Sequence, residues 1–406
     1  MKISNIEKGA WHVERIQLKK EFQEEMHKIL GWWSHYMIDD KNGGFFGRMD
    51  SYGTLFPKTD KGIILNARLL WTYSAAAIET GNSGYREFAD RAYQYLLEFF
   101  WDEVEGGVFW SVDFQGNYAD DQKQIYAQAF AIYALSEYYI LTHKREALDM
   151  ATEIFWLIEK YSLDMKKGGY YNAFARDWTD TDDIRLSEKD ANEAKIMNTH
   201  LHVLEAYTNF YRVESADFVK KALENIIQIF IDHFFISENG SMHIYFDEDW
   251  QPKSEHISFG HNIEASWLLW EAAEVLKDQK LLKKILPISI QMAKSVMEQG
   301  LDSDGGLLYE ADHEGIIDFD KHWWPQAEAV VGFWNAWQLS GEEAFAKASV
   351  NSWNFIKAFI IDPELGEWYW RTNREGVPIL SEDKAGPWKA PYHNVRMCLE
   401  LINRLS

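Results

Sequence analysis

The sequence is poor in cysteine, basic residues and long apolar runs, and each shortage excludes a class of protein. The single cysteine, Cys398, cannot form an internal disulfide, which argues against a disulfide-stapled secreted fold. With 41 Lys and Arg against 64 Asp and Glu, the formal charge of −23 disfavours binding to a nucleic-acid backbone. No apolar run reaches the roughly 18 residues of a membrane-spanning helix, and residues 1–20 lack the apolar core of a signal peptide. We therefore predict a cytoplasmic protein that contacts neither nucleic acid nor membrane.

Common cofactor and nucleophile motifs are missing as well. The double-glycine turns precede short aromatic runs rather than helices, so they are not phosphate-binding loops. HExxH is absent, and His200 and His202 have the wrong spacing to share a metal on one helix face. No GxSxG nucleophile elbow occurs. We predict no cofactor and no metal site; a metal assembled from three different helices stays open as an alternative.

Aromatic residues, in contrast, are abundant, with 19 Trp, 20 Tyr and 24 Phe in 406 residues. They belong to a repeat: a glycine-containing turn followed by an aromatic or apolar pair recurs six times, starting at Gly43, Gly106, Gly168, Asn239, Gly305 and Gly366. A second glycine turn follows in most units, and two short runs around a turn predict a β-hairpin. Six units of about 65 residues therefore fill the chain.

Two helical stretches lie between consecutive hairpins. One is amphipathic, as in 85–100 and 215–230, and the other is apolar on nearly every side, as in 127–139 and 263–275. Because a helix that is apolar all round must be buried, each unit contributes one outer and one inner helix. Twelve such helices predict an all-α (α/α)6 barrel, one domain over 1–406, with short β-hairpins at one end. An open helical solenoid is the alternative, because a repeat alone does not prove closure.

Polar residues gather at the first turn of every predicted inner helix, where an apolar helix has no structural need for them. In a closed ring, these turns converge on one central pocket. The residues concerned are Asn66, Arg68, Gln124, Tyr126, Gln128, Asn198, His202, His261, Glu264, Trp324, Gln326, Glu328, Trp388 and His393.

Spacing within these turns separates residues that share a helix face from residues that do not. Asn198 and His202 are four residues apart and share a face, whereas His200 is two residues from both and points elsewhere. Glu264 follows His261 by three residues, so its carboxylate can orient or charge-couple to that imidazole.

The tryptophans fall into two groups. Most of them, such as Trp71, Trp156 and Trp270, are predicted to fill space between helices. Trp324 and Trp388 instead stand beside polar residues of the first turns. An aromatic face flanked by hydrogen-bonding groups suits the apolar face of a sugar ring, so we predict a carbohydrate ligand.

A resemblance to a known family rests on five segments: LNARLLWTYSAA, MNTHLHVLEAYT, SFGHNIEASWLLWEA, KHWWPQAEAVVGFWNAW and GPWKAPYHNVRMC. Over its whole length the chain resembles the N-acylglucosamine 2-epimerase superfamily. The resemblance implies an (α/α)6 barrel and a cofactor-independent epimerisation. The reaction would invert carbon 2 of the reducing-end aldose of β-1,4-linked disaccharides such as cellobiose and lactose. Slow ketose formation would be a side reaction. It also implies the acid/base pair His261 and His393, surrounded by Arg68, Tyr126, Asn198, His202, Glu264, Trp324 and Trp388. We add Asp190, Tyr309 and Glu328 to the substrate-binding set, and expect a monomer or weak homodimer.

The residue types also suit epimerisation when they are considered without the resemblance. Inverting a carbon next to a carbonyl requires ring opening, removal of a proton, an enediolate, and return of a proton to the opposite face. Imidazole, with a free pKa of about 6.5, serves as base or acid near neutral pH, and His261 and His393 lie on different inner helices. Arg68 is a permanent cation for the developing oxyanion. Asn198 and His202 are available for ring opening and for holding the carbonyl oxygen.

Three other functions stay open at this point. An aldose–ketose isomerase acting on mannose or a related monosaccharide would use the same enediolate but return the proton to carbon 1. The GPWK run with Trp388 favours the epimerase over this isomerase, because Trp388 offers a platform for a second sugar. A glycoside hydrolase would use Glu264 and Glu328 as a carboxylate pair. A sugar-binding module without catalysis has no use for two opposed histidines.

Overall fold

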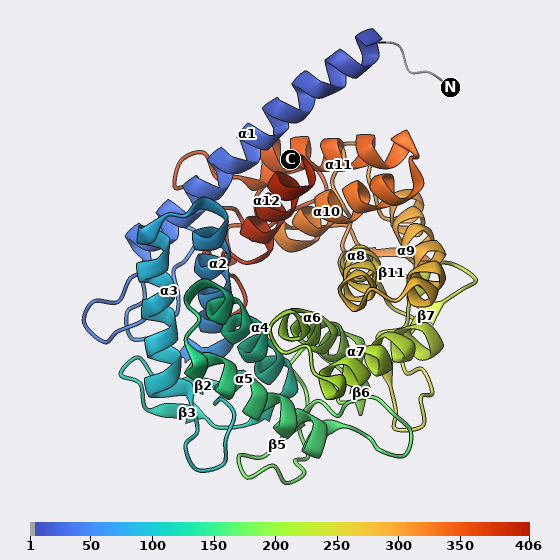
Figure 1. The fold of residues 1–406 in the computed structure, drawn as a ribbon. Coiled ribbons are helices and arrows are strands. Elements are labelled where there is room, and N and C mark those ends of the chain that lie inside the picture. The colour runs from blue at the N-terminus through green and yellow to red at the C-terminus, as the bar shows by residue number, and fades with distance from the viewer. Residues whose placement is uncertain (1–4) are drawn as a thin grey trace.

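The computed structural model describes residues 5–406, with side chains described from residue 15 onward, and its helices form two concentric layers (Figure 1). The inner layer consists of α2 (Ile63–Thr80), α4 (Ile125–Thr142), α6 (Met197–Val213), α8 (Phe259–Leu276), α10 (Trp323–Ser340) and α12 (His393–Arg404). The outer layer consists of α1 (Asn5–Tyr36), α3 (Ser83–Tyr95), α5 (Arg145–Leu157), α7 (Asp217–Ile229), α9 (Gln279–Gln299) and α11 (Glu343–Phe355). In the part of the chain that the structure describes, no helix has the length and apolarity to span a membrane.

The ring is closed, because the last inner helix packs against both of its inner neighbours. α12 contacts α10 and α2, and it also lies against α1, so that the first and last helices of the described chain pack together. The remaining inner helices pack in chain order, α2 on α4, α4 on α6, α6 on α8 and α8 on α10. The predicted (α/α)6 barrel is therefore confirmed, and the open solenoid is wrong.

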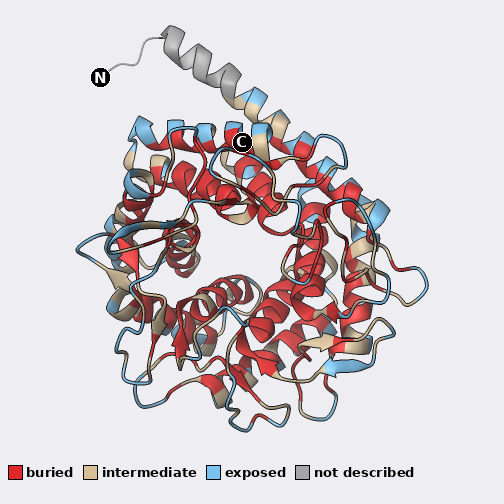
Figure 2. Cartoon of the chain, turned by 180° about the vertical axis from the view of Figure 1, so that it is seen from behind, coloured by how far each residue is buried: buried red, intermediate tan, exposed pale blue. Residues whose placement is uncertain are grey.

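Burial follows the predicted division between the layers (Figure 2). Every residue of α4 from Ile125 to Ser136 is buried, since this helix is enclosed by its neighbours. On α7 the buried side chains recur every three or four residues, at Val219, Ala222, Leu223, Ile226 and Ile227, and the positions between them face outward. Such a stripe is what an amphipathic outer helix requires.

The outer helices end in a way that the sequence did not predict. In the described chain, four of them pass into a π-helical turn: η1 (Leu96–Phe100), η2 (Ile158–Ser162), η3 (Phe230–Phe234) and η4 (Ile356–Ile360). In each turn a backbone N–H reaches back five residues, as from Trp101 to the carbonyl of Leu96. Recurrence in four units marks these turns as part of the repeat.

Short strands at one end join neighbouring units. The strand before an inner helix pairs antiparallel with a strand of the following unit: β1 (Lys61–Gly62) with β2 (Ser111–Val112), β4 (Lys123–Gln124) with β5 (Ala173–Phe174), β6 (Lys195–Ile196) with β9 (Tyr245–Phe246), β10 (Ile257–Ser258) with β11 (Glu310–Asp312), and β13 (Lys321–His322) with β14 (Arg371–Thr372). Consecutive strands form hairpins at three places within the described residues, from β2 to β3 (Tyr118–Asp120), β7 (Phe235–Ile236) to β8 (Ser241–Met242), and β11 to β12 (Gly315–Asp318). Around other second turns the predicted hairpin is reduced to a single bridge in the described chain, as between Met49 and Leu55 or Thr372 and Pro378.

A buried lysine precedes five of the inner helices in the described chain and pairs with an acidic residue of the glycine turn. The pairs are Lys61 with Asp39, Lys123 with Asp102, Lys195 with Asp164, Lys321 with Asp302 and Asp304, and Lys389 with Glu367. The Nζ–Oδ2 distance is 2.8 Å between Lys61 and Asp39, and Nζ of Lys61 also donates to the Gly43 carbonyl at 2.8 Å. Each lysine thus holds a glycine turn against the start of an inner helix. We call these residues the anchor lysines.

Candidate active site

The end of the barrel that carries the strands opens into a cavity of about 1180 Å³. Ten of the twelve residues predicted for the site lie in its wall: Tyr126, Asp190, Asn198, His202, His261, Glu264, Tyr309, Trp324, Trp388 and His393. The other two lie directly behind the wall. Arg68 donates to the hydroxyl of Tyr126 and the carbonyl of Trp388, both at 2.9 Å, and Glu328 binds His393.

A constant register places these side chains. The residue seven positions after each anchor lysine is directed to the middle of the barrel. Before α8, Ile257 stands where the other units have the lysine, and the residue seven positions after it, Glu264, is directed to the middle in the same way. These residues are Arg68, Phe130, His202, Glu264, Glu328 and Arg396. They contact one another around the axis, as where the Arg68 guanidinium lies 4.6 Å from the ring centre of Phe130 and Arg396 binds both Glu264 and Glu328.

His393 is held by a carboxylate on a neighbouring inner helix. Its Nδ1 lies 2.7 Å from Oε1 of Glu328, whose other oxygen accepts from the indole N–H of Trp267 at 3.1 Å. Because a carboxylate only accepts, Nδ1 carries the proton and Nε2 keeps its lone pair. Burial, followed by the positive charges of Arg68 and Arg396, places the pKa of His393 well below its ordinary value. The imidazole is therefore a neutral base at physiological pH.

His261 contacts the same indole as His393: the ring centre of Trp324 is 4.7 Å from that of His261 and 5.6 Å from that of His393. Burial lowers the pKa of His261 to about 3, so this ring is neutral as well. Its Nδ1 lies 2.8 Å from Oγ of Ser258, the residue that caps α8. The prediction that Glu264 orients His261 is wrong, because Oε1 of Glu264 is bound by Arg396 instead.

His202 and Asn198 share a face of α6 and both line the cavity, as their spacing predicts. Nδ1 of His202 lies 2.9 Å from Oε2 of Glu205, one helical turn further on. Burial lowers the pKa of His202, although Glu205 opposes this shift. Oδ1 of Asn198 is buried without a hydrogen-bond partner among the described residues, which leaves an acceptor for a ligand hydroxyl.

Two glutamines expected in the pocket hold the turns instead. Gln128 donates to the carbonyl of Val108 at 2.8 Å and accepts from its N–H at 2.9 Å, and Gln326 bonds the carbonyl and N–H of Leu307 in the same way. His200 points away from the pocket, as its spacing predicts, and accepts from the N–H of Tyr170 at 2.8 Å. All three stand three positions after the helix start, whereas the predicted pocket residues of α4, α6, α8 and α10 stand one, two or five positions after it.

The tryptophan predictions hold in part. Trp71 is buried against Tyr133, with ring centres 5.1 Å apart, whereas Trp156 on α5 is 49% exposed and covers only the outer side of the contact with Phe218 of α7, at 4.7 Å between ring centres. An amphipathic helix tolerates an apolar residue at its outer edge, so composition alone did not reveal this position.

A rival role for the histidines is metal binding. Glu264, Glu328 and His393 present one ligand atom each within 4.8 Å of one another. The guanidinium of Arg396 already lies between these carboxylates and donates to Oε1 of both. A fixed cation thus occupies the position that a metal would take, and the residues do not fit a metal site.

The same arrangement bears on the carboxylate pair of a glycoside hydrolase. Such a pair must stand on opposite sides of a glycosidic bond, at least about 5 Å apart. Here Glu264 and Glu328 converge on one guanidinium, and Glu328 lies behind His393 rather than in the cavity wall. The pair cannot flank a substrate in this geometry.

Comparison with known proteins gives the same assignment as the five segments. The model of the N-acylglucosamine 2-epimerase (GlcNAc 2-epimerase) family matches residues 44–397. The chain belongs to this family. Cellobiose 2-epimerase from Bacteroides fragilis is 47% identical over 387 residues, which are 95% of this chain and 98% of the relative. Cellobiose 2-epimerase from Dictyoglomus turgidum is 37% identical over 390 residues, covering 96% and 99%. The solved cellobiose 2-epimerase from Bacillus thermoamylovorans B4167 has a TM-score of 0.91 at 39% identity, covering 96% of this chain and 99% of that chain.

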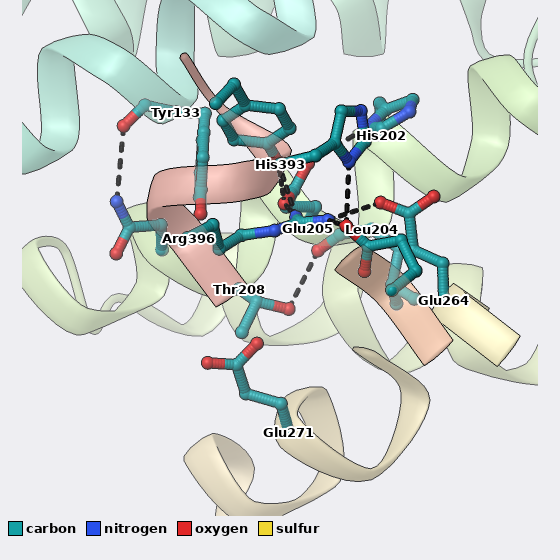
Figure 3. Close-up of polar contacts among 12 residues, drawn as sticks. Tyr133, His202, Leu204, Glu205, Thr208, Glu264, Glu271, His393 and Arg396 are labelled. Carbon is teal, nitrogen blue, oxygen red and sulfur yellow. Dashed lines mark hydrogen bonds and ion pairs between the residues drawn. The ribbon is translucent and has the colours of Figure 1, made fainter. Parts of the chain in front are cut away.

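The candidate site contains residues that the sequence analysis missed. Figure 3 shows the guanidinium of Arg396 directed at the carboxylates of Glu205 and Glu264. Tyr392 donates to Glu205, and Arg396 donates to the hydroxyl of Tyr392. Two signals were available: Glu205 follows His202 by three residues, and Arg396 stands seven residues after Lys389, as Arg68 does after Lys61.

Proposed function

We propose that this chain is a cofactor-independent carbohydrate 2-epimerase that inverts carbon 2 of the reducing-end unit of β-1,4-linked disaccharides, of the cellobiose 2-epimerase type. The observation that carries the proposal is the pair His261 and His393: two neutral imidazoles from different inner helices that both lie against Trp324 in one cavity. Relatives that carry the name cellobiose 2-epimerase over nearly the whole chain support it. We also propose a cytoplasmic location, supported by the single cysteine, Cys398, which is buried and free.

Ring opening is assigned to His202 and Asn198. With Nδ1 of His202 occupied by Glu205, Nε2 is the nitrogen available to take the proton of the anomeric hydroxyl and to return it to the ring oxygen. The free Oδ1 of Asn198, one helical turn away on the same face, accepts a hydroxyl of the opened chain. The product of this step is an aldehyde whose carbon 2 proton is acidic enough for imidazole to remove.

Epimerisation then needs one base on each face of carbon 2. One imidazole of the pair accepts the carbon 2 proton, and the electron pair moves into the enediolate. The other takes up a proton from solvent and donates it to the opposite face, while the first releases its proton to solvent, so that both rings return to the neutral form. Arg68, behind the hydroxyl of Tyr126, stabilises the negative charge on the enediolate oxygen. No hydride leaves the substrate, so the reaction requires no nicotinamide.

The rest of the cavity accommodates the sugar rings. Trp324 and Trp388 offer aromatic faces, and Trp388 lies 5.9 Å from Tyr126 between ring centres. Asp190, fixed by the hydroxyl of Tyr245 at 3.0 Å and by Ser187 at 2.7 Å, presents carboxylate oxygens to sugar hydroxyls. Tyr309 is stacked on His322 with ring centres 3.9 Å apart and is held rigid for a stacking role. The cavity volume exceeds that of one monosaccharide, which favours a disaccharide.

The test is incubation with cellobiose, lactose, mannose and N-acetylglucosamine in heavy water, followed by NMR of the products. We expect glucosyl-mannose from cellobiose and epilactose from lactose, each with deuterium at carbon 2, and near-complete loss of both in His393→Ala. A ketose with deuterium at carbon 1 as the main product would establish an aldose–ketose isomerase. Free glucose from cellobiose, retained in His393→Ala, would establish a hydrolase.

A further inference from the structure

One arginine connects the two histidines that the proposed mechanism uses in different steps. Glu205 binds Nδ1 of His202 with one oxygen and accepts from Arg396 with the other. Glu328 accepts from both Nδ1 of His393 and the same guanidinium, at 2.7 Å each. The result is a continuous chain, from His202 through Glu205, Arg396 and Glu328 to His393, in which every member is buried.

The carboxyl groups of this cluster outnumber its fixed cations by one. Glu205, Glu264 and Glu328 all bind Arg396. The guanidinium of Arg68 is the second positive charge that acts on both histidines. One proton therefore balances the cluster. Burial, followed by the neighbouring charge of Glu328, raises the pKa of Glu264, so this carboxyl is one place for that proton, and a single imidazolium, on either histidine, is the other. A second imidazolium would place an uncompensated positive charge in a buried site, which is costly.

We propose that Arg396 is a positioning residue that couples His202 to His393, so that the two imidazoles share a single proton and cannot both be charged. The inference rests on the proposed function. It means that His202 must release the proton that it takes up in ring opening before His393 accepts the proton of carbon 2. The contacts thereby impose an order on the two steps, although His202 and His393 lie on different helices and have no hydrogen bond to each other in the described chain.

Other groups also act on this cluster. The charged and titratable side chains around it are Arg68 on α2, Tyr126 and Tyr133 on α4, His202 and Glu205 on α6, His261 and Glu264 on α8, Glu328 on α10, Tyr392 just before α12, and Arg396 on α12. Glu205 binds His202 and makes no hydrogen bond to His393 among the described residues. Its charge still acts on His393 through space. The part of its effect that passes through Arg396 is therefore the part that is lost when Arg396 is replaced.

The experiment compares Glu205→Gln with the unsubstituted enzyme. Deuterium uptake at carbon 2 of cellobiose is measured as kcat/KM against pH. Loss of the Glu205 charge disfavours imidazolium at His393, so we expect the acid limb of the profile to move down by about one pH unit, equivalent to a tenfold change in proton affinity. The NMR titration of the His393 ring in the substrate-free variant should move in the same direction, which makes the readout independent of turnover.

Two further variants complete the test. Glu271→Gln is the matched control. Glu271 pairs with Arg212 at 2.6 Å beside the cluster and makes no hydrogen bond to Arg396 in the part of the chain described (Figure 3). The pH profile of kcat/KM for this variant should equal that of the unsubstituted enzyme. In Arg396→Lys, the shorter, single-pronged cation cannot bridge both carboxylates. Adding Glu205→Gln to this variant should therefore shift the profile clearly less than Glu205→Gln does alone, because only the direct effect of the Glu205 charge is left.

An unchanged His393 titration and carbon 2 profile in Glu205→Gln would overturn the coupling. So would an equal shift in Glu271→Gln, because the effect would then be a general loss of charge. If the unsubstituted enzyme exchanged no deuterium into cellobiose, the proposed function would fail, while the titration of His393 would still decide the coupling.

Discussion

Glu328 is the side chain whose replacement tests the proposed mechanism most directly. In Glu328→Gln the carboxylate that fixes Nδ1–H of His393 becomes an amide that is able to donate, and Nε2 is no longer held as the lone-pair nitrogen. A hydrogen bond to a charged group contributes about 1.5–3 kcal/mol. A misplaced proton adds to that loss, as in the serine protease triad, where removing the equivalent charge lowers kcat about 10⁴-fold. We expect kcat for carbon 2 exchange to fall about 10³-fold, or about 4 kcal/mol in activation free energy.

The split between kinetic constants separates this role from a general loss of structure. Glu328 is absent from the cavity wall, so KM for cellobiose should change by less than about threefold, a little over 0.6 kcal/mol. Deuterium incorporation by NMR gives both constants, and a thermal melt verifies that the variant is folded. A folded variant with kcat within tenfold of the unsubstituted enzyme would refute the assignment of His393 as a carboxylate-held base.

The remaining predictions concern the anchors and the cavity. Lys61→Met leaves the fully buried carboxylate of Asp39 without its cation and should cost about 3–5 kcal/mol, seen as a lower melting temperature; Lys61→Met combined with Asp39→Asn should recover most of it. Burial alone would raise the pKa of Asp39, but hydrogen bonds from Lys61 and the backbone outweigh it and lower the pKa, so the pair stabilises the fold above about pH 4 and less as pH falls below it. In acid titrations followed by circular dichroism, the doubly substituted protein should therefore lose less stability than the native chain. Trp388→Ala should raise KM for cellobiose at least about tenfold with a smaller effect on kcat; the reverse pattern would assign Trp388 to the chemical step.

Local patterns predicted the architecture because each unit repeats the same information. The apolar inner helices, the amphipathic outer helices and the glycine turns are all visible within about 65 residues, and six repetitions leave few ways to arrange them. First-turn position also identified eight residues of the cavity wall, since residues at the same point of a six-fold ring must converge. His202 was separated from His200 on spacing alone, and the contacts of His200 with Tyr170 confirm that it faces the turn.

The predictions failed where a contact joins distant segments. Glu205 and Arg396 are 191 residues apart, and no local spacing indicates that they meet. Glu264 was assigned to His261 because the two are neighbours on one helix, but the stronger attraction of a buried guanidinium from α12 takes its carboxylate away. Gln128 and Gln326 were placed in the pocket because the faces of a buried helix look alike in sequence. Only the partners of the backbone at Val108 and Leu307 distinguish the turn side from the axis side.

The anchor lysines have a consequence for how such a barrel acquires new activities. Each lysine secures its helix start through the glycine turn, while the residue seven positions later works at the axis, so the two tasks fall on different side chains. At that later position the six units carry arginine, phenylalanine, histidine, two glutamates and a second arginine, on starts that are otherwise built alike. Mutations there leave the anchor contacts in place. A library that varies Phe130 and its counterparts while retaining the lysines would therefore change the chemistry at the axis and keep the contacts that secure the helix starts.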